Sequence, residues 1–330
     1  MSAVSPPVPS PGDLAKWAFY VQFRKVLDPA RPRRFKPLRA VGRPVSKVLP
    51  LLNKKGYELM EDEFLRSGLE PRVREAWNIQ YRVAMEELVL GRHTKETLKD
   101  FVVFEGVHHL DAALAKGKGV VWVYPHAGAV MLMLTWLVKN GYPYTQYAAR
   151  GLAPKEVAEA HPELLGHNKW REEVRQAREE DEDLTGANFL SLSRPTRELY
   201  RVLARNELVG IAFDGRIGNK WKEYSWLGRR GLLNPGAWRL AASTGAMLVP
   251  CYNRVPPGEP ARCIIGEPVD PSAPDAARQV LDFAEEQIRR SPAEYGSWLL
   301  HCRIRNNIDD HPLFIDHAID DKWKKWADPR

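Results

Sequence analysis

Short apolar runs alternate with longer amphipathic segments between residues 101 and 290. β-Branched and aromatic residues are frequent in the short runs, which predict buried strands at 101–104, 120–124, 144–149, 208–213, 246–252 and 262–266. The segments between them predict helices at 107–116, 129–138, 235–244 and about 276–290. Strands that alternate with helices predict an α/β fold, in which a mostly parallel central sheet is flanked by helices.

One apolar segment has the length of a membrane span. Residues 119–138 carry no formal charge over 20 positions, and a helix of that length can cross a bilayer. Its interior argues against a span, because 120–124 has the composition of a strand and Pro125, His126 and Gly128 then interrupt the run. We therefore predict a strand, a tight turn and a buried helix, which together begin a βαβ unit.

The charge pattern divides the chain into three parts. We expect residues 1–70 to form a basic, amphipathic, membrane-facing helical segment, whose first ten residues are disordered. Residues 71–305 are expected to form the α/β domain, and residues 306–330 a solvated tail. Within the domain, the heavily charged stretch at about 154–182 predicts a solvated helical insertion or lid.

The positive charge is concentrated at the start of the chain. The net charge is +7, yet residues 1–60 hold 12 lysines and arginines against three acidic residues. Such a segment suits an anionic partner, and the aromatic and aliphatic residues interleaved at 14–23 fit a membrane interface better than a nucleic-acid groove. We expect an anionic membrane surface as the partner and no nucleic acid. The alternative is a basic helix packed on its own domain.

Candidate chemistry lies where predicted strands end. His126 follows one strand, Asp214 and Arg216 follow another, and Arg150 ends the strand between them. In open α/β sheets, ligands bind at this edge, where a neutral imidazole can take a proton from a hydroxyl or amine. Arginine can bind a polar head group or phosphate through two hydrogen bonds. The alternatives are a core histidine bound to a backbone carbonyl and a turn with a local ion pair.

Several other sites can be excluded from the sequence. It contains no G-x-S-x-G, no Walker A and no G-x-G-x-x-G motif. The three cysteines form no C-x-x-C pair, so we predict neither a disulfide framework nor a thiolate zinc site. This use of cysteine suits a reducing compartment. The acids and histidines at 309–311, 316–317 and 320–321 lack metal-loop spacing and are assigned to the solvated tail. His301 and Cys302, near Trp298, lack a base-orienting pattern and are interpreted as structural.

A set of short motifs resembles one family in its order along the chain. Gly117-Lys118-Gly119 through His126-Ala127-Gly128 resembles the strand and H-F-G-N-W-E turn of bacterial lipid A late acyltransferases, in the lysophospholipid acyltransferase superfamily. Arg150 falls at the Arg of the family's Y-R-P segment, and residues 207–214 resemble the stretch that ends in P-D-Q. Residues 234–250 resemble T-P-x-G…A…T-G-A-x-V-V-P, and residues 292–303 resemble P-E-Q-Y-x-W-x-H-R-R.

The chain departs from the family pattern at the turn. The family's H-x4-D/E motif has a carboxylate where this chain has Met131. Ala129 stands where the family turn has Asn, and Gly215 stands where the family has the Gln of P-D-Q. In the family, that carboxylate orients the histidine and stabilises its protonated form, which a thioether cannot do. Another acid, namely Asp214, Glu198 or Glu105, could replace it in space; otherwise the base acts unaided or activity is lost.

The resemblance implies an acyltransferase with a glycerolipid-acyltransferase-like fold. It would move an acyl group from an acyl carrier protein or coenzyme A thioester to a hydroxyl or amine of a lipid-like or specialised acceptor. The implied residues are His126 as general base, Asp214 as an orienting acid, and Gly128, Arg150 and Arg216 for substrate binding, with no metal and no cofactor beyond the thioester.

The family's usual N-terminal transmembrane helix is absent from the pattern, and no signal-peptide pattern opens the chain. We therefore expect a cytoplasmic protein bound peripherally to the inner membrane. The alternative function is a non-catalytic relative that binds lipid or carrier protein and has lost the His/acid pair. Met131 and Ala129 favour that alternative, whereas His126, Gly128 and Arg150 oppose it.

Overall fold

The central sheet has seven strands. The computed structural model describes residues 11–27, 30, 47, 53–148, 169–191, 196–216, 220–309 and 312–317. The strands follow the order β1-β9-β8-β2-β5-β3-β4, and every neighbouring pair is parallel except β8 and β9. Their bounds are β1 Val102–Glu105, β2 Val120–Tyr124, β3 Tyr144–Tyr147, β4 Asn188–Leu190, β5 Leu208–Ala212, β8 Met247–Arg254 and β9 Ala261–Ile265. The predicted α/β fold with a mostly parallel sheet is therefore confirmed.

Strand β2 lies near the centre of the sheet and is buried along its whole length. Because successive side chains of a strand point to opposite faces, Trp122 and Tyr124 pack in one apolar layer and Val121 and Val123 in the other. A strand covered on both faces has a continuous apolar sequence, which is why residues 120–124 could be predicted from composition alone.

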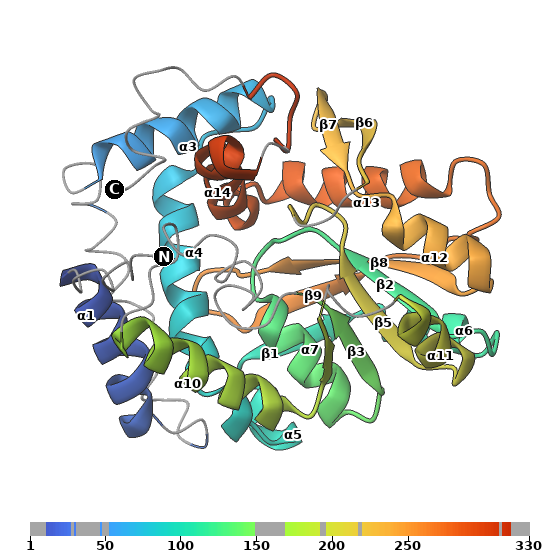
Figure 1. Cartoon of the computed structure of the whole chain (residues 1–330), viewed down its shortest axis with the longest axis horizontal. Helices are drawn as coiled ribbons and strands as arrows, with labels where there is room; N and C mark the ends of the chain where they lie inside the picture. Colours follow the sequence, from blue (N-terminus) through green and yellow to red (C-terminus); the bar gives the residue numbers. More distant parts are fainter. Residues whose placement is uncertain are drawn as a thin grey trace, which may run out of the picture.

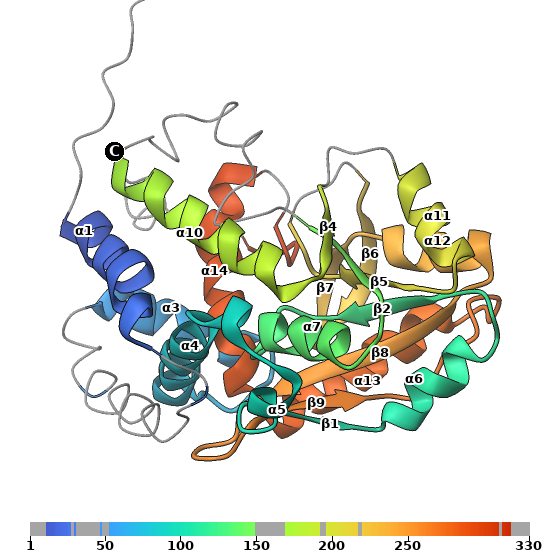
Figure 2. The same ribbon diagram turned by 90° about the horizontal axis from the view of Figure 1, so that it is seen from below.

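Helices cover both faces of the sheet (Figures 1 and 2). On one face α6 and α7 contribute Leu110, Met133 and Leu134 to the layer around Trp122, whereas α13 packs against β8 in the other layer. The bounds of the helices in the α/β part are α5 Lys95–Leu98, α6 Val107–Leu114, α7 Val130–Lys139, α11 Arg197–Ala204, α12 Gly236–Thr244, α13 Ala276–Arg290 and α14 Ala293–Asp309. The predicted helices at 107–116, 129–138, 235–244 and 276–290 all form.

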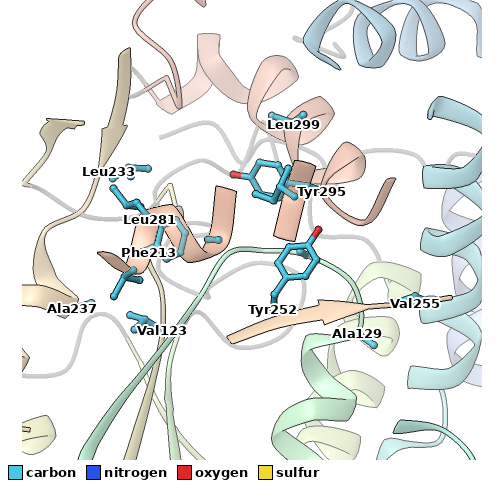
Figure 3. Packing of buried hydrophobic residues seen from close by; sticks show 14 of the residues in the cluster. Val123, Ala129, Phe213, Leu233, Ala237, Tyr252, Val255, Leu281, Tyr295 and Leu299 are labelled. Atoms are coloured by element: carbon cyan, nitrogen blue, oxygen red, sulfur yellow. The ribbon is translucent and has the colours of Figure 1, made fainter. Parts of the chain in front are cut away.

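The larger apolar layer extends beyond the strand ends. Figure 3 shows Tyr295 and Leu299 of α14 gathered with Phe213, which follows β5, and with Tyr252 of β8; all four belong to one buried cluster. Helices α3 (Lys54–Arg66) and α4 (Val73–Glu87) pack against α14 and complete this side of the molecule. The carboxyl ends of β2 and β5 therefore lie against this packed apolar layer.

The end of the described chain is packed rather than solvated. The hairpin β6 (Lys222–Trp226) and β7 (Arg229–Leu233) bridges to residues 312–317 through Gly231 and Phe314. Leu313 and Phe314 are fully buried, and His317 is 2% exposed. The prediction of a solvated tail is wrong for residues 312–317, because two large apolar side chains there complete the core.

The charged helix α10 (Lys169–Thr185) has a buried face as well as a solvated one. It packs against the N-terminal elements α1 (Pro11–Trp17), η1 (Ala18–Gln22) and η2 (Phe23–Val26), and against η4 (Leu90–Arg92). Arg24 forms ion pairs with Asp181 at 2.9 Å and Glu180 at 2.8 Å, and Arg171 pairs with Asp13 at 2.7 Å. Where the basic segment is described at 11–27, it packs on its own domain through these contacts, while Lys16 and Lys25 stay exposed, and its membrane-facing role stays a prediction.

The residues 1–10, predicted to be disordered, and all six basic residues of 31–43 lie outside the described part of the chain. Within the described residues, no helix is both long and apolar enough to span a membrane. The apolar segment 119–138 forms the predicted strand, turn and helix.

Candidate active site

His126 and Asp214 meet at the carboxyl ends of two neighbouring strands. Strands β2 and β5 are parallel and in register, with Tyr124 opposite Ala212. His126 and Asp214 each follow their strand by two residues, so the register places them side by side. The His126 Nδ1 atom lies 2.7 Å from Asp214 Oδ1. Strand pairing thus brings together two residues that lie 88 positions apart in the sequence.

The Asp214 carboxylate is fully buried and accepts hydrogen bonds from three groups. Besides the imidazole, the backbone N–H of His126 donates to it at 3.0 Å and the Tyr295 hydroxyl at 2.9 Å. Burial raises the pKa of Tyr295 well above its usual value, and the charge of Asp214 adds to that rise, so the hydroxyl remains a donor. The three donors hold the carboxylate in one orientation.

This arrangement determines which imidazole nitrogen is free to react. A carboxylate only accepts hydrogen bonds, so Nδ1 of His126 carries the hydrogen and Nε2 keeps its lone pair. The His126 side chain is 36% exposed, whereas Asp214 is buried beneath it. The pair can therefore present a base to a molecule at the surface and stabilise the imidazolium that forms when the base takes a proton.

Helix α14 adds an aromatic contact that the sequence analysis missed. The Trp298 ring lies against the His126 ring, with centroids 3.8 Å apart and planes 15° apart. The His301 ring in turn lies 4.8 Å from Trp298 and nearly parallel to it. The interpretation of His301 and Cys302 as structural gave Trp298 no role; the place of Trp298 in the family's closing motif was the available signal.

Gly128 shapes the turn that carries His126. Its φ of +61° is left-handed, and a Cβ there would lie 2.2 Å from the backbone oxygen of Asn253. Only glycine fits, because both the conformation and the space exclude a side chain. Its N–H donates to the backbone oxygen of Glu294 at 3.3 Å. These contacts give Gly128 a role in the turn, and the substrate-binding role stays a prediction.

The two predicted arginines differ in what the structure shows of them. The Arg216 side chain is 7% exposed, donates to the backbone oxygens of Leu232 at 2.8 Å and Gly215 at 3.3 Å, and lies over the Trp221 ring. Those contacts bind it to the protein itself, and a contact with substrate stays a prediction. Arg150 lies outside the described residues.

Position 131 lies at the start of α7, where this helix meets α4 and α10. Met131 lines a small pocket with Tyr20, Glu87 and Arg178. Burial raises the pKa of Glu87 to about 7, although the charge of Arg178 and a hydrogen bond from the Met131 backbone N–H oppose that rise. A carboxylate from another helix therefore already lies at the start of α7.

Of the acids that the sequence left open as replacements, Asp214 is in contact with His126. Glu105 forms an ion pair with Arg262 at 2.7 Å on the surface, and Glu198 lies in the first turn of α11. The position next to the imidazole is thus occupied by Asp214, two residues after the end of β5.

Replacing Met131 with glutamate is expected to leave activity unchanged or to lower it. The new carboxylate would lie beside Glu87 and Glu182 rather than His126, and repulsion between like charges would raise the pKa of each acid. We expect a loss of thermal stability, measured by scanning calorimetry, with no gain in turnover. Met131→Gln is the control for side-chain shape without charge, and a tenfold rise in turnover with glutamate would contradict this geometry.

Comparison with known proteins identifies one family over most of the chain. The model of the family described as bacterial lipid A biosynthesis acyltransferase matches residues 70–305. A phosphatidylinositol mannoside acyltransferase of Mycobacterium tuberculosis is 29% identical over 154 residues, which are 46% of this chain and 43% of that protein. The protein of the same description in Mycolicibacterium smegmatis is 26% identical over 219 residues, 65% of this chain and 59% of that one. The match thus spans only about half the length of these relatives.

A solved structure also aligns with the chain. The crystal structure of the 1-acyl-sn-glycerophosphate acyltransferase from Thermotoga maritima has 19% identity and a TM-score of 0.32, and the alignment covers 74% of this chain and 95% of that one.

Proposed function

Since the chain belongs to the bacterial lipid A biosynthesis acyltransferase family, we propose that it transfers an acyl group from a thioester donor to a hydroxyl or amine of a lipid-like acceptor. The donor would be an acyl carrier protein or coenzyme A thioester. The contact of His126 Nδ1 with the buried Asp214 carboxylate is the observation that carries the proposal.

The pair would act as a general base and then as a general acid. His126 Nε2 takes the proton of the acceptor O–H or N–H while the acceptor oxygen or nitrogen attacks the thioester carbonyl carbon. When the tetrahedral intermediate collapses, the C–S bond breaks and the imidazolium returns the proton to the sulfur, which leaves as a free thiol. Asp214 keeps Nδ1 protonated and stabilises the imidazolium. General base catalysis of this kind contributes about 10²- to 10⁴-fold.

The intact pair favours an enzyme over the non-catalytic alternative. Met131 and Ala129 favoured the loss of the His/acid pair, but the Asp214 carboxylate contacts His126 and accepts a hydrogen bond from Tyr295. A buried carboxylate bonded to a partly exposed imidazole at the carboxyl ends of the strands is the arrangement that a general base requires, and this supports an enzyme.

Acceptor-dependent thiol release tests the function directly. Purified protein would be incubated with acyl-coenzyme A or acyl carrier protein thioester and with a lysophospholipid, a phosphatidylinositol mannoside or a long-chain amine; the relatives' names suggest the mannoside. We expect free thiol to appear at the rate at which a product of acceptor plus acyl mass forms. Tight lipid binding with no product in any combination would favour the non-catalytic alternative.

We also propose that the protein binds peripherally to an anionic membrane surface, on the cytoplasmic side of the inner membrane. Lys16, Lys25 and the 43%-exposed Leu14 project from the N-terminal elements that pack on α10. In flotation with vesicles, binding is expected to require anionic lipid and to weaken with salt.

At about 1 kcal/mol per basic residue near the surface, Lys16→Gln with Lys25→Gln should weaken binding about thirtyfold. The matched control is Lys116→Gln with Lys118→Gln, which removes two exposed lysines between α6 and the amino end of β2. Equal losses in both double variants, or equal binding to neutral vesicles, would contradict this orientation.

A further inference from the structure

The His126 imidazole has a second support besides Asp214, and it comes from the face of its ring. The hydrogen bond at Nδ1 restrains one edge of the ring but makes no contact with its face. The Trp298 indole lies 3.8 Å from the imidazole at 15° and restrains the plane of the ring, because a ring turned about its Cβ–Cγ bond would lose the face-to-face contact or collide with the indole.

Helix α14 supplies both supports of the His/Asp pair. Tyr295 donates to Asp214, and Trp298, three residues later on the same helix face, lies on His126. The Trp298 Nε1 atom is buried and has no hydrogen-bond acceptor among the described residues. The indole is therefore oriented by its ring contacts with His126 and His301 rather than by a hydrogen bond.

We propose that Trp298 is a positioning residue for the transfer reaction, an inference that rests on the proposed function. It holds the plane of His126 so that Nε2 points at the acceptor proton, and its π face stabilises the imidazolium that forms when that proton is taken. The indole acts on the base and not on the substrate, so its loss should lower kcat and leave KM nearly unchanged.

The experiment compares two substitutions at Trp298 with one at a matched tryptophan. Trp298→Leu should lower kcat about 10- to 100-fold with KM within about twofold, since small misplacements of a catalytic group cost this much. Trp298→Phe retains an aromatic face and should recover most of that loss. Trp136 is the control: it is also partly exposed and lies on Phe104 at 3.8 Å and 13°, away from His126. Trp136→Leu should keep kcat within about twofold.

A spectroscopic readout reports the stack without turnover. In protein labelled at histidine Cε1, the signal of His126 is identified among those of the nine histidines as the one that His126→Gln removes. The ring current of Trp298 should shift that signal upfield in the wild type; Trp298→Leu should abolish the shift and Trp136→Leu should leave it unchanged. Melting temperatures of all variants separate loss of folding from loss of positioning.

Each outcome decides one of the two proposals. If the wild type is active, an unchanged kcat in Trp298→Leu overturns the positioning role. So does a loss of kcat that is equal in Trp298→Phe and Trp298→Leu, or equal in Trp136→Leu and Trp298→Leu. A His126 signal that is not shifted upfield in the wild type also overturns it. If wild-type protein gives no acceptor-dependent transfer from either donor, the proposed function itself is refuted, and the positioning role with it.

Discussion

Replacing His126 with glutamine is expected to lower acyl transfer by about 10²- to 10⁴-fold while the fold is retained. Glutamine can still donate an N–H to Asp214, but its amide cannot take a proton at neutral pH. The side chain is 36% exposed, so little packing is lost, and thermal unfolding should stay near that of the wild type. A large loss of stability with transfer retained would identify a structural histidine and remove the base from the mechanism.

Asp214→Asn tests the other half of the pair. The amide would present an N–H to Nδ1 of His126, which would favour the tautomer with the hydrogen on Nε2, and the base would be lost without a change of shape. In serine proteases, the equivalent change costs about 10⁴-fold, and we expect at least 10²-fold here. Tyr295→Phe removes one donor to Asp214 but leaves the pair, so its effect should be smaller.

Glu105→Gln is the control for this experiment. It makes the same acid-to-amide change at a surface ion pair with Arg262 and should leave the rate unchanged. A rate lowered equally by Glu105→Gln and Asp214→Asn would contradict the assignment of Asp214 as the orienting acid.

Replacing Glu63 with glutamine is expected to cost about 3–5 kcal/mol of stability, as for other broken buried ion pairs. Glu63 on α3 is fully buried and lies 2.8 Å from Arg229, 3.2 Å from Arg303 and 2.7 Å from His317 Nε2, which donates to it. The neutral amide would remove the buried countercharge of Arg229 and Arg303, which would keep only the more exposed Asp316 and Asp62 as acidic partners, and would loosen the segment 312–317 from the core. Chemical unfolding monitored by tryptophan fluorescence measures the loss.

The same cluster makes stability depend on acid. Burial opposes ionisation of Glu63, but the hydrogen bond from His317, its charge and that of Arg229 outweigh burial and lower the pKa to about 2 from an ordinary 4.5. A carboxyl with a lowered pKa in the folded state stabilises the fold fully above its unfolded pKa. Its contribution is lost as pH falls from about 4.5 towards 2.

Wild-type protein should therefore lose stability over that pH range more steeply than Glu63→Gln. Glu223→Gln, at an exposed ion pair with Arg230 on the neighbouring hairpin, is the matched control and should change neither stability nor its pH dependence. Parallel pH profiles of wild type and Glu63→Gln would show that this cluster does not govern acid unfolding.

The buried strands and the turn after β2 followed from the sequence because their signals are local. A central parallel strand is apolar on both faces, so 120–124 and 208–213 could be predicted as short apolar runs with turn residues after them. Residues that follow such strands share one edge of the sheet, and this placed His126 and Asp214 among the candidates before their contact was known. The order of the family's motifs added the reaction class.

The charge pattern predicted less of the fold, because a charged segment indicates an exposed face but does not show which other elements pack against the segment. The alternation of acids and bases in α10 indicated a solvated helix, yet Val174 and Ala177 are buried on that helix, and Arg24 pairs with its acids. In the same way, the acidic residues and histidines at the end of the chain predicted a solvated tail, although Leu313 and Phe314 within it are buried in the core.

The partner of His126 was decided only by the tertiary structure. Periodicity depends on neighbours a few residues away, whereas strand order depends on how the connecting helices pack across the sheet. That packing sets β5 beside β2 in register, which brings Asp214 to the imidazole and leaves Glu105 at the surface with Arg262. It also places Trp298 of α14 on the imidazole ring, a contact between residues 172 positions apart that no local pattern encodes.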